Sequence, residues 1–224
     1  MRSVPIRGKK HPLAIGKMLC LGKNFAAHAR EMGDSGKNQP VVFLKPASAI
    51  LLPGNPILLP PFSGNVHYEV ELVVAVGKTG KNIPEEGVTN HILGYAVGLD
   101  LTARDLQSLA KQKGEPWAVA KGFDGSAPLS EITPRNEAPQ KIEELEISLR
   151  INGVIRQKAL LSEMIWSIPR TLAYLSTIFT LERGDLIFMG TPEGVGPLHP
   201  GDRMEAEIRG LVSVAFEVTG NQFP

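Results

Sequence analysis

Two glutamates and one aspartate carry the strongest chemical signal in this sequence. Glu69 and Glu71 are two residues apart in the apolar segment 67–76, so in a strand both side chains would project from the same face. Two like charges on one face of a buried strand are costly unless something neutralises them. Asp100, at the end of a second apolar segment, offers a third carboxylate. Three hard oxygen ligands suit Mg²⁺ or Mn²⁺. The alternative is a solvated edge strand with outward-facing glutamates.

Two further pairs of residues have a spacing that suits chemistry near such a site. His28 and Glu31 are three residues apart on a predicted short helix, so they share a face and can act as a general base that activates water. Arg104 and Gln107 have the same spacing just after Asp100. They would place an arginine near the metal, where a substrate carboxylate can dock. Both pairs also have a plainer interpretation, as polar or salt-bridging pairs on the surface.

Lys121 follows the short apolar run 117–120. A lysine there can stabilise a developing enolate, or it can simply extend from the core toward solvent.

Other catalytic classes find no support, because the chain has neither a phosphate-binding loop that ends in Gly-Lys-Ser/Thr nor a Gly-x-Ser-x-Gly elbow. The single cysteine, Cys20, lies in an apolar run and is predicted to be a core residue. One cysteine also excludes an internal disulfide framework and a zinc site made of thiolates.

The elements that must position these residues are mostly short strands. Gly (23) and Pro (18) are abundant without any repeat, which favours many turns. The predicted strands are 13–21, 41–44, 67–76, 92–99, 146–151, 154–158, 185–189 and two strands within 202–219. The predicted helices are 24–33, a helix that begins with Thr102 as N-cap and ends at Gly114, and 169–180 with Ser167 as N-cap. In the second helix Leu106, Leu109 and Ala110 are predicted to form the buried face. The run 117–120 is predicted to be extended.

The composition argues against several classes of partner. The chain has 224 residues, of which 42% are hydrophobic, and 24 basic against 23 acidic residues give a net charge of +1. Nucleic acid would require a basic face, and no such charge excess is present. No run reaches the roughly 18 apolar residues of a membrane span. We therefore expect one domain with its own core. The cysteine usage fits a reducing compartment, so we expect a cytoplasmic protein.

Several ordered motifs together resemble the fumarylacetoacetate hydrolase superfamily. They are HYEVEL at 67–72, GLDLTARDLQ at 98–107 and GTPEGVGP at 190–197. The segments GKNFAAHAREM at 22–32, FLKP at 43–46 and KGEPWAVAK at 113–121 resemble its acylpyruvase and oxaloacetate decarboxylase branch. The similarity runs from about Met18 to Val218, which is almost the whole chain.

The resemblance implies a fold that the residue pattern alone does not define. It implies an α+β, β-rich chain folded as a mixed, rolled β-sandwich with a few short helices, usually as a homodimer. The whole of 1–224 would then be a single catalytic domain, with an N-terminal strand segment at 1–17 and the family core at 18–218. A chain of this length is too short for the extra N-terminal domain of the larger family members.

The resemblance also implies roles for particular side chains. Glu69, Glu71 and Asp100 would hold one Mg²⁺ or Mn²⁺, and no organic cofactor is expected. His28 and Glu31 would form a water-activating dyad on a mobile lid helix, with Lys121 as the third catalytic residue. The residues that would face the substrate are Lys23, Arg104, Gln107 and Thr191.

The activity implied by the resemblance is the cleavage or decarboxylation of a short β-dicarbonyl α-keto acid. Acylpyruvate hydrolysis and oxaloacetate decarboxylation would share a pyruvate enolate. Two other reactions at the same site stay open, namely keto–enol tautomerisation of oxaloacetate and a decarboxylase/isomerase or hydratase reaction on larger dicarboxylates from aromatic meta-cleavage. A non-enzymatic alternative is a β-rich module whose cation is purely structural.

Overall fold

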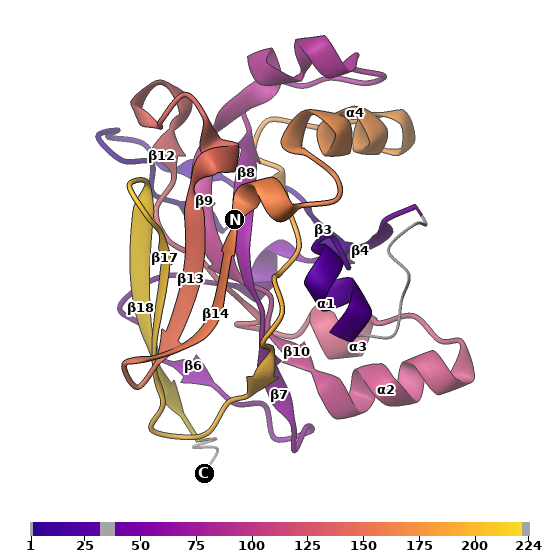
Figure 1. The fold of residues 1–224 in the computed structure, drawn as a ribbon, viewed down its shortest axis with the longest axis vertical. Helices are drawn as coiled ribbons and strands as arrows, with labels where there is room; N and C mark the ends of the chain where they lie inside the picture. Colours follow the sequence, from indigo (N-terminus) through magenta and orange to yellow (C-terminus); the bar gives the residue numbers. More distant parts are fainter. Residues whose placement is uncertain (1, 32–38, 221–224) are drawn as a thin grey trace.

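The computed structural model describes residues 2–31 and 39–220, and two β-sheets form the body of this part of the chain (Figure 1). The first sheet has six strands in the order β12-β9-β8-β15-β3-β4, and the second has five in the order β14-β13-β17-β18-β6. The second sheet packs on the first through β13, β17 and β18, which contact β8 and β9. The predicted β-rich, mixed sandwich with few helices is confirmed.

The strands and helices are short, as the abundance of glycine and proline predicts. The six-stranded sheet consists of β3 (Met18–Gly22), β4 (Val41–Lys45), β8 (Val70–Val76), β9 (Ile92–Leu99), β12 (Thr133–Pro134) and β15 (Leu186–Phe188). The five-stranded sheet consists of β6 (Ile57–Leu58), β13 (Glu146–Ile151), β14 (Val154–Leu160), β17 (Arg203–Ile208) and β18 (Val212–Thr219). The α-helices are α1 (Ala26–Glu31), α2 (Arg104–Lys113), α3 (Ala118–Lys121) and α4 (Ile168–Ile178).

Smaller elements connect and flank the two sheets. A three-stranded sheet contains β7 (Val66–Tyr68), β10 (Thr102–Ala103) and β16 (Gly196–Pro197). Two strand pairs are β1 (Ser3–Val4) with β2 (Leu13–Ala14) and β5 (Ile50–Leu51) with β11 (Ala127–Pro128). The 3-10 turns are η1 (Ala47–Ala49), η2 (Glu85–His91), η3 (Arg135–Glu137), η4 (Ile142–Glu144) and η5 (Leu161–Glu163).

Strand β8 is buried along its whole length because both of its faces are covered. Val70, Leu72, Val74 and Val76 belong to the apolar core that includes residues of the second sheet, whereas Val73 and Ala75 belong to a separate core on the opposite face. Since side chains alternate along a strand, Glu71 projects on the side of Val73, away from the second sheet. The site is therefore built on the outer face of the six-stranded sheet, where α1, α2 and α3 lie (Figure 1).

Several sequence-based predictions of elements are confirmed. Strand β9 matches the predicted bounds, and Asn152 and Gly153 connect β13 to β14 with positive φ values of 53° and 79°. Helix α4 begins after Ser167, whose side chain accepts a hydrogen bond from the Arg170 N–H. The described part of the predicted helix 24–33 is α1, and its predicted end at Gly33 lies outside the described residues.

Other predictions of elements are wrong, and each fails where tertiary pairing decides the structure. The segment 67–76 is two strands rather than one, because the chain leaves the three-stranded sheet at Tyr68 and enters the six-stranded sheet at Val70. The predicted strand 13–21 is interrupted at Gly16, which lies so close to the Asp185 carboxylate that a Cβ there would be 2.6 Å from Oδ1. The run 117–120 is helical, since Lys121 N–H donates to the Trp117 carbonyl over 2.9 Å.

The helix after Asp100 also differs from its prediction. Thr102 lies in β10 and is not the N-cap, because its hydroxyl donates to the Asp100 carbonyl and the helix begins at Arg104. The predicted buried face is right for Ala110 but wrong for Leu109, which is 45% exposed, and Gln107 is buried instead. The helix ends at Gly114 as predicted, with φ at +69°.

Candidate metal and substrate site

The three predicted carboxylates meet at one place in the fold. Glu69 precedes β8, Glu71 lies within it and Asp100 follows β9, and these neighbouring antiparallel strands pair Val70 with Leu99. The Asp100 N–H donates to the Glu69 carbonyl over 2.8 Å. One carboxylate oxygen from each residue lies within 4.8 Å of the others, and all three side chains are buried. The interpretation as a solvated edge strand is therefore wrong.

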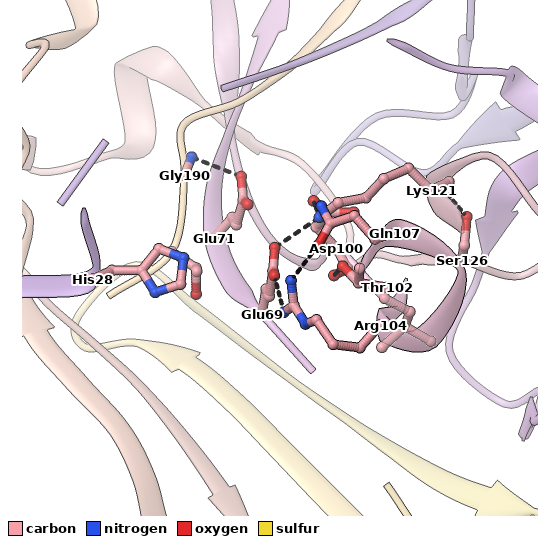
Figure 2. Close-up of polar contacts among 12 residues, drawn as sticks. His28, Glu69, Glu71, Asp100, Thr102, Arg104, Gln107, Lys121, Ser126 and Gly190 are labelled. Carbon is pink, nitrogen blue, oxygen red and sulfur yellow. Dashed lines mark hydrogen bonds and ion pairs between the residues drawn. The ribbon is translucent and has the colours of Figure 1, made fainter. Parts of the chain in front are cut away.

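Two basic side chains bond to this triad directly from the helices beside it (Figure 2). Lys121 Nζ lies 2.8 Å from Glu69 Oε2 and also donates to Asp100 Oδ2. Arg104 donates to Glu69 Oε1. Burial alone would raise the pKa of Glu69, but Lys121 and Arg104 outweigh burial and hold that pKa well below its ordinary value. Burial opposes the charged form of Lys121, yet Asp100 and Glu69 raise the pKa of its ammonium.

Glu71 has a different environment from its neighbour. Its Oε2 accepts a hydrogen bond from the Gly190 N–H over 2.7 Å. The pKa of Glu71 is raised well above its ordinary value by burial and by the charges of Asp100 and Glu69. Asp100 Oδ1 has a partner of its own, because the buried Lys45 ammonium lies 2.8 Å from it. An under-neutralised carboxylate, Glu71, within a cluster of three buried carboxylates fits a divalent cation, and Glu69, Glu71 and Asp100 are the residues that would hold it.

The predicted dyad is formed. His28 Nδ1 lies 2.9 Å from Glu31 Oε2, with the His28 side chain buried and that of Glu31 36% exposed. A carboxylate that accepts from Nδ1–H leaves Nε2 as the ring's proton acceptor. In the view of Figure 2 the imidazole lies across from Arg104 and Lys121, with Glu69 and Glu71 between them. This arrangement can take a proton from a water molecule on one side while cations hold negative charge on the other.

The four residues expected to face the substrate line the same pocket as the dyad histidine and the glutamates. These residues are Lys23, Arg104, Gln107 and Thr191. Arg104 donates to Gln107 Oε1 over 2.7 Å, so the predicted pair is real and faces the interior rather than the surface. Lys23 turns the chain at the end of β3 with φ at 62°. The structure thus gathers every predicted site residue in or beside one pocket, and their functional roles stay predictions.

Several residues of this site were not singled out by the sequence pattern. Lys45 is almost completely buried, and its Nζ lies 2.8 Å from Asp100 Oδ1. Phe43, Lys111 and Trp117 line the pocket, with the Lys111 ammonium 5.2 Å from the Trp117 ring centre. Lys111 follows Arg104 by seven positions and Gln107 by four, so helical spacing offered a signal for it. For Lys45 the sequence signal was only its position in the FLKP motif.

Cys20 is confirmed as a core residue. It is fully buried in β3, and burial raises the pKa of its thiol well above the ordinary value. A thiol in that environment stays protonated and inert. None of the helices in residues 2–31 and 39–220 has the length and apolar character needed to cross a bilayer.

Residues 17–219 match the family model described as fumarylacetoacetate (FAA) hydrolase C-terminal. Among proteins similar to the chain is the mitochondrial oxaloacetate tautomerase FAHD1 of Mus musculus. It is 45% identical over 206 residues, which are 92% of this chain and 93% of that protein.

Solved structures with the same fold include two enzymes. The fumarylpyruvate hydrolase of Pseudomonas aeruginosa, in complex with Mn²⁺ and pyruvate, superposes with a TM-score of 0.93 and is 41% identical, covering 98% of this chain and 96% of that one. The 5-carboxymethyl-2-hydroxymuconate delta-isomerase of Mycobacterium smegmatis has a TM-score of 0.83 and is 36% identical, covering 95% of this chain and 82% of that one.

Proposed function

The chain belongs to the fumarylacetoacetate hydrolase C-terminal family, and we propose that it is a divalent-metal-dependent enzyme acting on short α-keto acids with a second carbonyl or carboxylate group β to the keto carbon. The observation that carries this proposal is the buried triad of Glu69, Glu71 and Asp100 with Lys121 and Arg104 bonded to it. The Pseudomonas aeruginosa hydrolase, whose structure contains Mn²⁺ and pyruvate, supports both the metal and the keto acid. The expectation of Mg²⁺ or Mn²⁺ is part of the proposal.

The charges around the pocket favour an anionic substrate. Four basic side chains line it, namely Lys23, Arg104, Lys111 and Lys121, against the two carboxylates Glu69 and Glu71. Arginine recognises a carboxylate through paired N–H donors. A keto acid with two negative charges therefore suits this pocket better than a neutral ketone does.

The proposed chemistry passes through an enolate. A divalent cation in the triad would supply Lewis-acid polarisation of the keto acid oxygens. Lys121 holds negative charge that develops on the keto oxygen, and Arg104 docks a carboxylate. In decarboxylation the electrons of the broken C–C bond move toward the keto oxygen as CO₂ leaves, so no water is needed. In acylpyruvate hydrolysis His28 takes a proton from the water that attacks the distal carbonyl, and Glu31 holds the ring in place. The C–C bond next to that carbonyl then breaks, which releases a carboxylic acid and the enolate of pyruvate.

Keto–enol tautomerisation of oxaloacetate is a second candidate activity, favoured by the 45% identity to the Mus musculus tautomerase. It passes through an enolate at the same position, which is the enolate of oxaloacetate itself, because a C3 proton is lost and the distal carboxylate is kept. A reaction on larger dicarboxylates is the third, because the Mycobacterium smegmatis isomerase shares the fold.

A side-by-side assay tests these alternatives. Oxaloacetate, acetylpyruvate, fumarylpyruvate and a seven-carbon hydroxydienedioate are supplied with Mn²⁺ or Mg²⁺, and tautomerisation and CO₂ release are followed separately. We expect the short keto acids to react, chelator to abolish turnover and either metal to restore it. Glu69→Gln should lose Mn²⁺ affinity in calorimetry together with activity. Full turnover in metal-free protein, or intact Mn²⁺ affinity in Glu69→Gln, would contradict the proposal.

Other expectations from the sequence stay predictions. They are the homodimer, the single catalytic domain over 1–224, the cytoplasmic location and the absence of a nucleic-acid or membrane partner. Sedimentation analysis of the purified protein tests the homodimer directly.

A further inference from the structure

Gln157 is a buried polar residue in a strand that is otherwise turned toward solvent. It is 1% exposed, while its neighbours Arg156 and Lys158 in β14 are exposed. The pairing of β14 with β13 changes register here, with Leu149 opposite Gln157 and Arg150 opposite Ile155. Arg156 is therefore the extra residue of a bulge, and bulges redirect the side chains next to them. Gln157 faces inward because it lies opposite the buried Leu149, and the bulge turns Ile155, two residues before it, toward solvent.

The amide of Gln157 joins two parts of the proposed site. Its Oε1 accepts from the Val70 N–H over 2.9 Å, and Val70 lies between Glu69 and Glu71. Its Nε2 donates to Thr191 Oγ1 and to the Pro192 carbonyl, each over 2.8 Å. A backbone N–H can only donate and a carbonyl can only accept, so these two backbone partners fix the orientation of the amide.

This fixed orientation determines what the Thr191 hydroxyl can do. Because Oγ1 accepts from Gln157, its own hydrogen must point elsewhere. Within the described part of the chain no protein oxygen accepts that hydrogen. Thr191 lines the pocket, so its hydroxyl is left as a donor there. A donor at this position suits an anionic oxygen of a bound keto acid.

The loop 190–196 that carries Thr191 is seated on β14 at the same bulge. Gly194 has φ at +93°, and a Cβ there would lie 2.2 Å from the Arg156 carbonyl oxygen. On its other side the Gly194 N–H points to Glu31 Oε1 at 3.4 Å. Gly190 N–H bonds to Glu71 at the start of the loop. Gln157 thus anchors the loop between the glutamate strand and the dyad.

We infer that Gln157 is a positioning residue that seats the loop 190–196 and holds the Thr191 hydroxyl as a donor toward the substrate. The seating follows from the hydrogen bonds alone. The identity of the acceptor, an oxygen of an α-keto acid, rests on the proposed function. The two parts are tested separately.

Hydrogen exchange in the metal-free and ligand-free protein tests the seating. Gln157→Met keeps the size of the side chain but removes its three hydrogen bonds, so the amides of residues 190–196 should exchange faster. Lys158→Gln, an exposed change in the same strand, is the matched control and should leave the loop unchanged. Unaltered exchange of the loop in Gln157→Met overturns the inference, whatever the protein turns out to catalyse.

A double-mutant cycle tests the action through Thr191. Gln157→Glu can still accept from Val70 but cannot donate, so the Thr191 hydroxyl would turn to the new carboxylate. We expect kcat/KM for the preferred keto acid to fall about 10- to 100-fold, the effect of losing a hydrogen bond to a charged group. In a Thr191→Val background the same change should cost less than about threefold. Equal losses in both backgrounds would show that Gln157 does not act through Thr191.

Binding measurements separate this inference from the proposed function. If no keto acid is turned over, pyruvate binding in the presence of Mn²⁺ replaces kcat/KM in the cycle. Wild-type protein that binds neither Mn²⁺ nor pyruvate contradicts the proposed function, and hydrogen exchange then decides the role of Gln157. If Gln157→Glu does not fold, Gln157→Met takes its place in the cycle, with a smaller expected loss because the Thr191 hydroxyl is released but not captured.

Discussion

Lys45 Nζ lies 2.8 Å from Asp100 Oδ1, and both side chains are almost completely buried. The same ammonium donates to the Leu101 carbonyl over 3.2 Å and to the Ser126 carbonyl over 3.0 Å. It also donates to the carbonyl of Lys121. One lysine from the edge strand β4 therefore holds the end of β9 and the end of α3 together. Those two ends carry a proposed metal ligand and the proposed enolate-stabilising lysine.

Replacing Lys45 should destabilise the protein strongly. In Lys45→Met the Asp100 carboxylate loses one of its two buried cationic partners, the other being Lys121, and several carbonyl groups lose a donor. Breaking a buried ion pair by removing one member costs about 3–5 kcal/mol, and we expect the free energy of unfolding to fall by that amount in chemical denaturation. Lys141→Met is the control, because it removes an exposed ion pair with Glu144. It should change the free energy of unfolding by less than about 1 kcal/mol. Similar losses in the two variants would contradict the role given to Lys45.

The parts of the site that could be predicted are those whose geometry is local. A separation of two along a strand put Glu69 and Glu71 on one face, and a separation of three along a helix paired His28 with Glu31. Lys45 could not be predicted in this way, because its contacts depend on which strand lies beside β4 and on where α3 ends. Gln157 could not be predicted for a related reason, since its burial depends on the strand pairing that places it opposite the buried Leu149.

The secondary structure shows the same difference between features set by local pattern and features set by tertiary pairing. Periodicity and turn residues were enough for β9, for the hairpin of β13 and β14, and for α4, because each is a complete local pattern. The break at Glu69 was not predictable, since the apolar alternation continues through it while the pairing partners change from β10 and β16 to β9 and β15. The run 117–120 is too short for periodicity to separate a helix from a strand.

The pKa of Glu71 predicts an unusual pH dependence of the metal-free protein. An unfolded glutamate has a pKa of about 4.3, and burial with the charges of Asp100 and Glu69 raises the folded value well above the ordinary one. Between the two values the folded protein holds one more proton than the unfolded chain. The free energy of unfolding should therefore decrease as pH rises through this window.

Glu71→Gln isolates this effect. The amide can still accept from the Gly190 N–H, and it removes the repulsion among the three acids. In chelator-treated samples we expect the variant to be more stable than wild type at pH 7–8 and to lose this part of the pH dependence. It should also lose Mn²⁺ affinity in calorimetry. Parallel stability curves for the two proteins from pH 5 to 8 would show that Glu71 is not under electrostatic stress.

His28 should matter more for reactions that consume water. In His28→Gln acylpyruvate hydrolysis loses its proposed general base, a contribution of typically 10²- to 10⁴-fold in rate. Oxaloacetate decarboxylation breaks a C–C bond without water and should fall much less. The ratio of the two kcat values within each protein is the measurement, because it cancels differences in active fraction. Equal losses in the two reactions would argue against water activation by the dyad of His28 and Glu31.

Lys111 should select substrates that carry a second negative charge. Its ammonium lies over the Trp117 ring at the pocket, and burial together with Arg104 and Lys23 lowers its pKa. No carboxylate in residues 2–31 and 39–220 forms an ion pair with it, so a distal carboxylate of the substrate would relieve repulsion among these cations. In Lys111→Met we expect kcat/KM for dianionic oxaloacetate to fall about two- to fivefold, the scale of an exposed ion pair, with a smaller change for monoanionic acetylpyruvate. Salt should reduce the difference in kcat/KM between the two substrates.

Lys113→Met is the control, because Lys113 lies two positions further along α2 and outside the pocket lining. It should leave kcat/KM for both substrates unchanged. Equal losses for the two substrates in Lys111→Met would instead assign Lys111 to packing against Trp117.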